Sequence, residues 1–311
     1  MKRKLTSIIL VILFALSLVY LSGCQQGGRD TTENYRTGTE GIRMNFLSNA
    51  PPNRVYEGNP LQVVVEVENK GAYPQDSDSF EGYLVFSGPT DASVNVGQRT
   101  KQIPVDLPGR SYSFPKGGTQ TVTFEDNSVQ VPSDAEKYDA PILITSCYKY
   151  QTIASPTVCI DPNPYDTVKT VKPCTVRENV AIDSGQGGPI VVSRVEEYMT
   201  RNTATFRITF RNSDSGQVFK LSSMSDCIDT DLKYNDINRI NVQVSSPSLG
   251  NADCTPDNGQ VMLSNGKGFM TCKFDVSHVG GSAYTEQLRI VMDYGYSDYI
   301  KTNVDIINID E

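Results

Sequence analysis

The sequence predicts an all-β protein with two tandem sandwich domains that follow a signal peptide and a flexible tether. Two segments, 61–68 and 204–211, place apolar residues at every second position. This period of two is typical of half-buried antiparallel strands. The 24 glycines and 17 prolines supply the turns that many short strands need. Few stretches have a helical pattern, and residues 194–201 fit a helix and a strand equally well.

The two halves of the chain repeat each other. Residues 142–150 (ILITSCYKY) align with 288–296 (LRIVMDYGY) at an offset of 146, whereas the alternating segments repeat at an offset of 143. Self-similarity at this period indicates a duplicated domain rather than a short solenoid repeat. We expect the boundary near 171–174, so the predicted domains are 42–172 and 173–311.

Each half begins with an alternating strand behind a proline or glycine turn, and we expect each to end in a tyrosine-rich hairpin. Such a unit predicts a two-sheet sandwich of the immunoglobulin or fibronectin type III kind. Residues 51–71 (PPNRVYEGNPLQVVVEVENKG) resemble the opening of immunoglobulin-like modules of prokaryotic surface proteins, known as the cell-adhesion-related domain of bacteria. The resemblance implies a fold rather than a ligand, and it covers fewer residues in the second half.

The first residues are typical of an export signal. Lys2, Arg3 and Lys4 precede an apolar run over 8–21, and small residues then lead to Cys24. The ending Leu-Ser-Gly-Cys resembles a bacterial-type lipobox, which implies cleavage before Cys24 and a lipid on its sulfur. The alternative is an uncleaved signal anchor, because the apolar stretch is nearly long enough to span a bilayer.

Residues 1–23 are therefore the predicted signal peptide, and 24–41 the predicted tether, which is polar and has no apolar periodicity. We expect the body of the protein to be held at the extracytoplasmic face of the cell membrane. The formal net charge of −8 argues against a nucleic-acid partner and against an electrostatic hold on anionic lipid. The expected partners are the membrane, through Cys24, and an unidentified protein or glycan.

Six cysteines remain once Cys24 is assigned to lipid. An even number of cysteines in an exported chain indicates disulfides. No pair has the Cys-x-x-Cys spacing of a zinc site. The predicted disulfide cysteines are Cys147, Cys159, Cys174, Cys227, Cys254 and Cys272.

The repeat suggests one disulfide pair. Cys147 and Cys159 correspond to Asp293 and Asp305 of the second half. Because both cysteines are lost together, we expect them to be partners on the two arms of the terminal hairpin. Their aspartate counterparts would then face each other across two strands, where they could splay into water, share a basic residue or hold a cation.

The other four cysteines allow three pairings. Cys254 and Cys272 flank two Asn-Gly turn signals and can meet locally, which leaves Cys174 with Cys227. If Cys174 reached back across the boundary instead, the two domains would be rigidly coupled.

Residues of catalytic or cofactor chemistry are scarce. His278 is the only histidine, and the chain contains no Gly-x-Ser-x-Gly or His-Glu-x-x-His motif. We therefore expect no cofactor and no enzyme activity. Four tyrosines alternate with other residues near the ends of the halves, which favours core packing over an aromatic binding surface. They are Tyr148, Tyr150, Tyr294 and Tyr296.

Together these features predict a lipid-anchored cell-surface protein with a non-catalytic binding, adhesive or structural role in the envelope. An alternative is an accessory lipoprotein subunit of a secretion, pilus or transport complex. A remote alternative is an exported hydrolase.

Overall fold

The computed structural model describes most of the chain that follows the predicted signal peptide. It describes residues 35–74, 79–89, 93–132, 135–166, 171–183 and 185–308. The predicted signal peptide, Cys24 and most of the tether lie outside the described residues. The described residues belong to one compact unit, Tyr35–Glu311.

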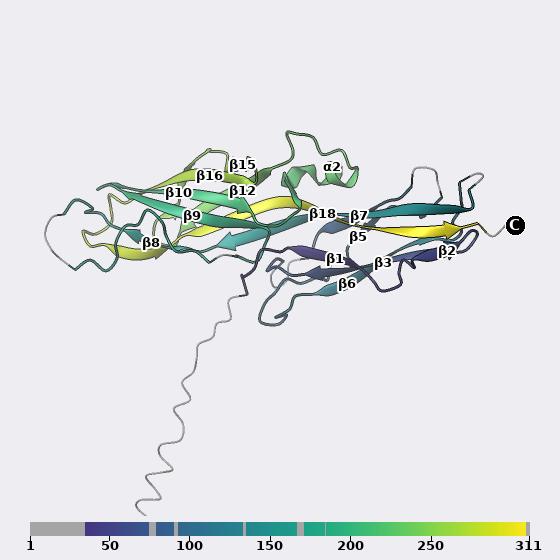
Figure 1. The fold of residues 1–311 in the computed structure, drawn as a ribbon. Coiled ribbons are helices and arrows are strands. Elements are labelled where there is room, and N and C mark those ends of the chain that lie inside the picture. Colours follow the sequence, from purple (N-terminus) through teal and green to yellow (C-terminus); the bar gives the residue numbers. More distant parts are fainter. Residues whose placement is uncertain are drawn as a thin grey trace, which may run out of the picture. The chain divides into compact units, whose positions relative to one another are not determined.

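Strands dominate this unit (Figure 1). The described part contains a single short α-helix, α2 (Met224–Ile228), preceded by a 3-10 turn, η1 (Leu221–Ser223). The predicted all-β class is therefore confirmed.

The first half contributes a three-stranded antiparallel sheet. It contains β1 (Ile42–Phe46), β3 (Leu61–Asn69) and β6 (Thr119–Asp126), in the order β1-β3-β6. The predicted alternation is confirmed in β3, where every second residue from Leu61 to Val67 is buried.

The second half contributes the corresponding sheet in the order β14-β16-β10-β9. Its strands are β9 (Ile190–Met199), β10 (Thr203–Asn212), β14 (Asp253–Thr255) and β16 (Lys267–Asp275). The segment 194–201, which fitted a helix and a strand equally well, is a strand as far as Met199.

A nine-stranded sheet combines strands from both halves. Its main path runs β13-β12-β18-β7-β4-β5, and β2, β11 and β15 pair beside it. Its strands are β2 (Arg54–Tyr56), β4 (Gly82–Ser87), β5 (Thr100–Gln102), β7 (Lys137–Ala154), β11 (Gln217–Phe219), β12 (Arg239–Ser246), β13 (Gly250–Asn251), β15 (Gln260–Met262) and β18 (Arg289–Ile307). A separate two-stranded sheet joins β8 (Thr157–Ile160) to β17 (Tyr284–Gln287).

The hairpin predicted at the end of each half is wrong. The repeated segments pair with each other instead, because β7 and β18 run antiparallel along their whole lengths. Lys149 lies opposite Gly295, its own counterpart at the offset of 146. Exchanging each residue of the ladder for its repeat counterpart therefore gives the same set of pairs. The two strands are thus related by a local pseudo-twofold axis.

Through the β7–β18 ladder, strands of each half pair with strands of the other half. The C-terminal part of β18 lies beside the part of β7 that pairs with β4, and its last residues pair with β2. The C-terminal part of β7 lies beside the part of β18 that pairs with β12. Strands before and after the predicted domain boundary, between residues 172 and 173, are therefore hydrogen-bonded to one another.

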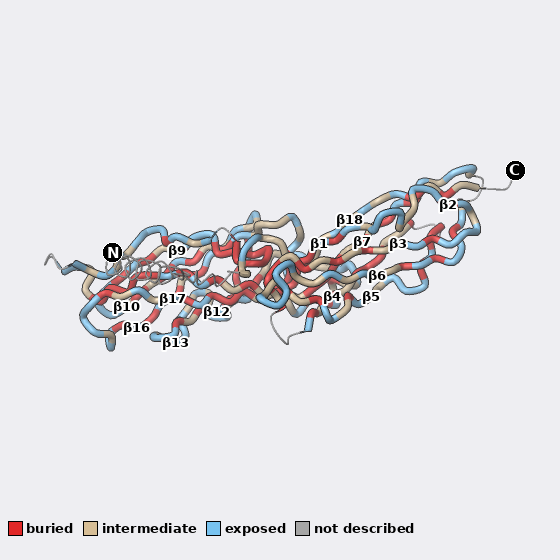
Figure 2. The backbone as a smooth tube through the Cα atoms, turned by 90° about the horizontal axis from the view of Figure 1, so that it is seen from below, coloured by how far each residue is buried: buried red, intermediate tan, exposed pale blue. Residues whose placement is uncertain are grey.

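The three-stranded and the four-stranded sheet pack on the shared sheet through one continuous cluster of buried side chains. Figure 2 marks the buried residues of these strands in red. In the first half, Phe86 of β4 meets Phe124 of β6, with ring centroids 5.6 Å apart. Apolar faces of two sheets that close on each other give a sandwich.

Candidate functional site

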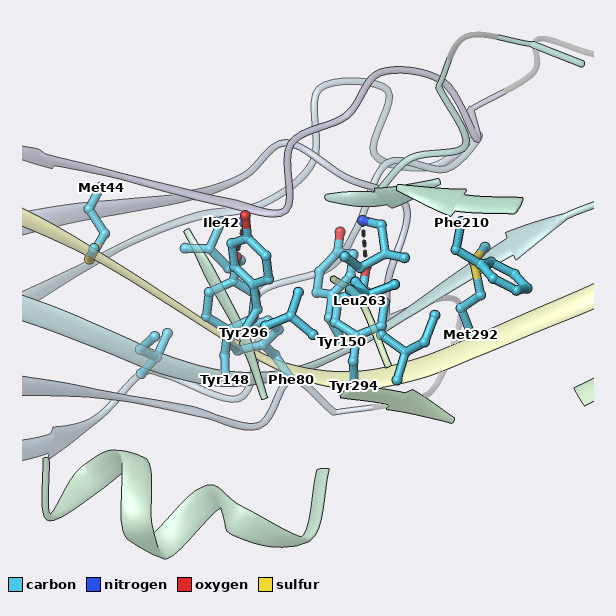
Figure 3. Packing of buried hydrophobic residues seen from close by; sticks show 14 of the residues in the cluster. Ile42, Met44, Phe80, Tyr148, Tyr150, Phe210, Leu263, Met292, Tyr294 and Tyr296 are labelled. Carbon is cyan, nitrogen blue, oxygen red and sulfur yellow. Dashed lines mark hydrogen bonds between the residues drawn. The ribbon is translucent and has the colours of Figure 1, made fainter. Parts of the chain in front are cut away.

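The junction of the two halves is the most elaborately built part of the structure. Tyr148, Tyr150, Tyr294 and Tyr296 lie side by side on one face of the β7–β18 ladder (Figure 3), and all four are fully buried. The ring centroids of the cross-strand pairs are 5.8 Å and 6.2 Å apart. Packing, the favoured interpretation of these tyrosines, is confirmed.

The phenol groups tie the ladder to the strands above it. Tyr150 donates to the Asn69 Oδ1 atom (3.2 Å), and Tyr296 donates to the Asn212 Oδ1 atom (3.2 Å). Asn69 and Asn212 are repeat counterparts at the offset of 143. These asparagines were not singled out from the sequence as partners of the tyrosines, although both recur in step with them.

The other two tyrosines repeat a second contact. The Tyr148 hydroxyl accepts a hydrogen bond from the Ile42 amide (3.2 Å), and the Tyr294 hydroxyl accepts one from the Ile190 amide (3.4 Å). Burial raises the pKa of Tyr148 and Tyr294 well above the ordinary tyrosine value. These hydroxyls are therefore neutral hydrogen-bonding groups of the core.

Two glycines allow backbone to approach the cluster. A Cβ atom on Gly71 would lie 1.8 Å from the Tyr150 hydroxyl oxygen, and one on Gly188 would lie 2.2 Å from the Thr152 Oγ1 atom. These positions exclude every other residue type unless the cluster rearranges. The segment that precedes β1 also contacts this part of the junction, because the Gly187 amide donates to the Gly38 carbonyl (3.0 Å).

A disulfide closes the opposite face of the junction. Cys147 of β7 is bonded to Cys227 of α2, and both are buried with Phe219 and Met224. The predicted partner, Cys159, is on β8, which turns away from β7 to pair with β17. Cys147 and Cys159 are therefore not the arms of a hairpin, and the predicted bond between them is wrong.

Cys159 is bonded to Cys174, so the predicted Cys174–Cys227 bond is also wrong. The alternative in which Cys174 reaches back across the boundary is the one found. The predicted Cys254–Cys272 bond is confirmed, and it joins directly opposite residues of β14 and β16. All six cysteines predicted to form disulfides do so.

A buried carboxylate lies next to the Cys159–Cys174 bond. Glu197 of β9 accepts hydrogen bonds from the amides of Cys159 (2.8 Å) and Arg177 (2.7 Å). Burial raises its pKa. The adjoining cavity of about 260 Å³ is lined by these residues, Cys174 and several threonines. Because each carboxylate oxygen holds a backbone amide, Glu197 acts as a clamp between segments of the two halves.

Asp293 and Asp305 do not face each other, so that prediction is wrong. They lie twelve positions apart on β18, about 40 Å along an extended strand. Asp293 accepts a hydrogen bond from Gln151 (2.8 Å), and Asp305 forms an ion pair with Lys137 (2.9 Å). No group of three or more potential metal-binding side chains occurs among the described residues.

His278 lies in an exposed turn after β16. None of the described helices has the length and apolar character needed to cross a membrane. In comparisons with known proteins, the chain matches no protein-family model and no curated protein.

Proposed function

We propose that this chain is a lipid-anchored protein of the cell surface with a non-catalytic binding, adhesive or structural role. The observation that carries the proposal is the pairing of all six cysteines after Cys24 into three disulfides. Structural disulfides form and persist in oxidising compartments. They accord with a leader that exports the chain and leaves one cysteine for lipid.

We propose further that residues 42–172 and 173–311 derive from two immunoglobulin- or fibronectin III-like sandwiches. The first half has a three-stranded sheet and the second half a four-stranded one, and each half supplies one long strand to the shared sheet. The resemblance of residues 51–71 to adhesion-related modules supports this assignment.

Support for a non-catalytic role comes from how the polar groups of the core are used. The buried tyrosines and Glu197 are engaged by backbone amides and asparagine side chains. General acid–base catalysis needs a titratable group within reach of a substrate. These groups instead hold segments of the protein together.

The attachment point of the tether suits an anchored protein. Residues 35–41 lie against the junction, where Arg110 hydrogen-bonds the Thr37 hydroxyl (3.3 Å) and the Lys70 amide donates to the Gly41 carbonyl (2.8 Å). A pull on Cys24 would therefore act on the part of the protein that the Cys147–Cys227 bond braces.

The test is the intact mass of the protein purified from host membranes, before and after reduction and alkylation. We expect a mass without residues 1–23, a lipid adduct on Cys24, and six cysteines that alkylate only after reduction. A Cys24→Ala variant should lose the adduct and the cleavage but keep the three disulfides. An intact leader in the wild type would overturn lipid anchoring, and free thiols before reduction would overturn the compartment argument.

A further inference from the structure

The outer faces of the β1-β3-β6 sheet and the β14-β16-β10-β9 sheet are repeat counterparts, yet they differ in charge. Strand pairing places β3 on β10 at an offset of 143 and β6 on β16 at an offset of 148. Under this register Glu68 corresponds to Arg211, and Glu125 corresponds to Lys273. Two positions thus reverse their charge between the halves.

The outer face of the second half, termed the basic face, carries five cations and two exposed aromatic rings. Tyr198 is 50% exposed and Phe269 is 56% exposed. The Arg207 guanidinium lies 4.4 Å from the Phe269 ring centroid, within cation–π range. The cations of the basic face are Arg194, Arg207, Arg211, Lys267 and Lys273.

Part of this charge has no internal counterpart. Glu196 forms ion pairs with Arg194 (2.8 Å) and Arg207 (3.8 Å). Arg211 and Lys267 are directly opposite on β10 and β16, where like charges destabilise a sheet. Within the described part of the chain, neither of them forms an ion pair. Asp253 and Asp275 lie at the far end of the same face.

The outer face of the first half, termed the acidic face, carries Glu66, Glu68 and Glu125 among threonines and polar residues. Glu68 forms an ion pair with Lys70 (2.9 Å), and Glu125 accepts a hydrogen bond from Gln62 (2.7 Å). Arg43 is the only cation of the outward residues on β1, β3 and β6, and it pairs with Glu40.

We propose that the basic face of one copy binds the acidic face of a second copy of this chain. The argument is charge complementarity: the same chain displays both faces on the same kind of sheet. The unpaired Arg211–Lys267 cations would gain carboxylate partners, and the Phe269 ring would be covered. Complementary potentials of this kind also steer association and exclude wrong registers.

The size of the faces sets the strength of this contact. Three strands of about eight residues cover roughly 14 by 26 Å. This is below the ~800 Å² per partner of a stable complex. The association should therefore be weak, concentration-dependent and sensitive to salt. Confinement to a membrane surface would raise the effective concentration, although the contact itself does not depend on how the chain is anchored.

The experiment compares charge-reversed variants of the full protein in non-ionic detergent by sedimentation equilibrium. R211E/K273E makes both faces acidic, and E68R/E125K makes both faces basic. We expect the wild type to associate and its association to weaken at high salt. Each variant alone should associate at least about tenfold more weakly than the wild type, whereas an equimolar mixture should associate again. The mass of the complex in the mixture shows whether two copies form a closed dimer or further copies add to an open assembly.

The control variant K233E/K301E changes the net charge by the same amount as R211E/K273E, at exposed positions away from both faces, and should behave as the wild type. Unchanged melting temperatures show that the variants fold. A wild type that stays monomeric at every concentration would overturn the proposal, as would a mixture that associates no better than its components. Retention of monomeric wild type on an anionic polysaccharide, lost in R211E/K273E, would assign the basic face to a glycan instead.

Discussion

Removal of the Cys147–Cys227 disulfide tests how the two halves are held together. The bond closes a loop with a sequence separation of 80 residues. The Cys159–Cys174 bond lies within this loop and shortens it. The chain-entropy model then gives about 4 kcal/mol of stabilisation through the unfolded state. Because Cys147 and Cys227 are buried with Phe219 and Met224, their replacement by alanine also loosens packing.

The assay is urea denaturation of a C147A/C227A variant, followed by far-UV circular dichroism. We expect the free energy of unfolding to fall by about 4 kcal/mol or more. The matched control is C254A/C272A, which opens a separation of only 18 residues and should cost about 3 kcal/mol on the same model.

A single C147A variant checks the pairing itself. Its free thiol should be at Cys227, and peptide mapping after alkylation identifies it. A free thiol at Cys159 would restore the pairing expected from the repeat and refute the account of the junction. A C147A/C227A variant that loses less stability than C254A/C272A would refute the larger contribution expected for the Cys147–Cys227 bond.

Three further predictions concern the core. Gly71→Ala should destabilise by about 1–3 kcal/mol, since its Cβ would meet the Tyr150 hydroxyl, whereas Gly97→Ala, with open space around it, should change the unfolding free energy by less than about 0.5 kcal/mol; equal losses would contradict this. Burial raises the pKa of Glu197 in the folded protein. The stability that this shift contributes is therefore complete below the pKa of the unfolded state and is lost as pH rises through the pKa of the folded state. Melting temperatures should therefore fall less steeply over that window in Glu197→Gln, and parallel curves would contradict the shift. In an alkaline absorbance titration, the four buried tyrosines should ionise only on unfolding, because burial raises their pKa; ionisation of every tyrosine in the folded protein would contradict it.

The local patterns of the sequence predicted strands well. The alternation in β3 and β10 survives unchanged, because a half-buried strand needs an apolar residue at every second position. The repeat at offsets of 143 and 146 also corresponds to real counterparts, down to the hydrogen bonds that Asn69 and Asn212 accept. These features depend on neighbouring residues and on spacing, which a sequence displays directly.

The disulfide pairing failed because the two halves are not equal in length. The offset rises from 143 at β10 to 158 at β12, as the register of β4 with β7 and of β12 with β18 shows. The extra residues of the second half include α2 and Cys227. Among the described residues of the first half, no helix corresponds to α2, and Asp293 pairs with Gln151 instead. The replacement of both cysteines by aspartate in the second half is therefore no evidence that Cys147 and Cys159 are partners.

The predicted hairpins failed for a similar local reason. Pro156 follows the end of β7, and its counterpart at the offset of 146 is Thr302, inside β18. Pro156 has no amide to donate to a ladder, and β7 ends two residues before it, whereas β18 continues past Thr302. Which strand then pairs with β7 depends on contacts between distant segments, and these leave no periodic pattern in the sequence.

The two halves are parts of one chain, and this explains why their differences lie where they do. In a symmetric dimer of identical chains, any change at one site appears at both. A duplicated chain escapes this constraint, so one copy of the long strand carries Cys147 and the other Asp293. The core around the pseudo-twofold axis keeps its symmetry, because the four tyrosines must pack against one another across it. The outer faces have no such constraint, and there the counterparts Glu68 and Arg211 have opposite charge. The asymmetry of this protein is therefore concentrated at α2, which is bonded to β7 through Cys227, and on the two surfaces that we assign to binding.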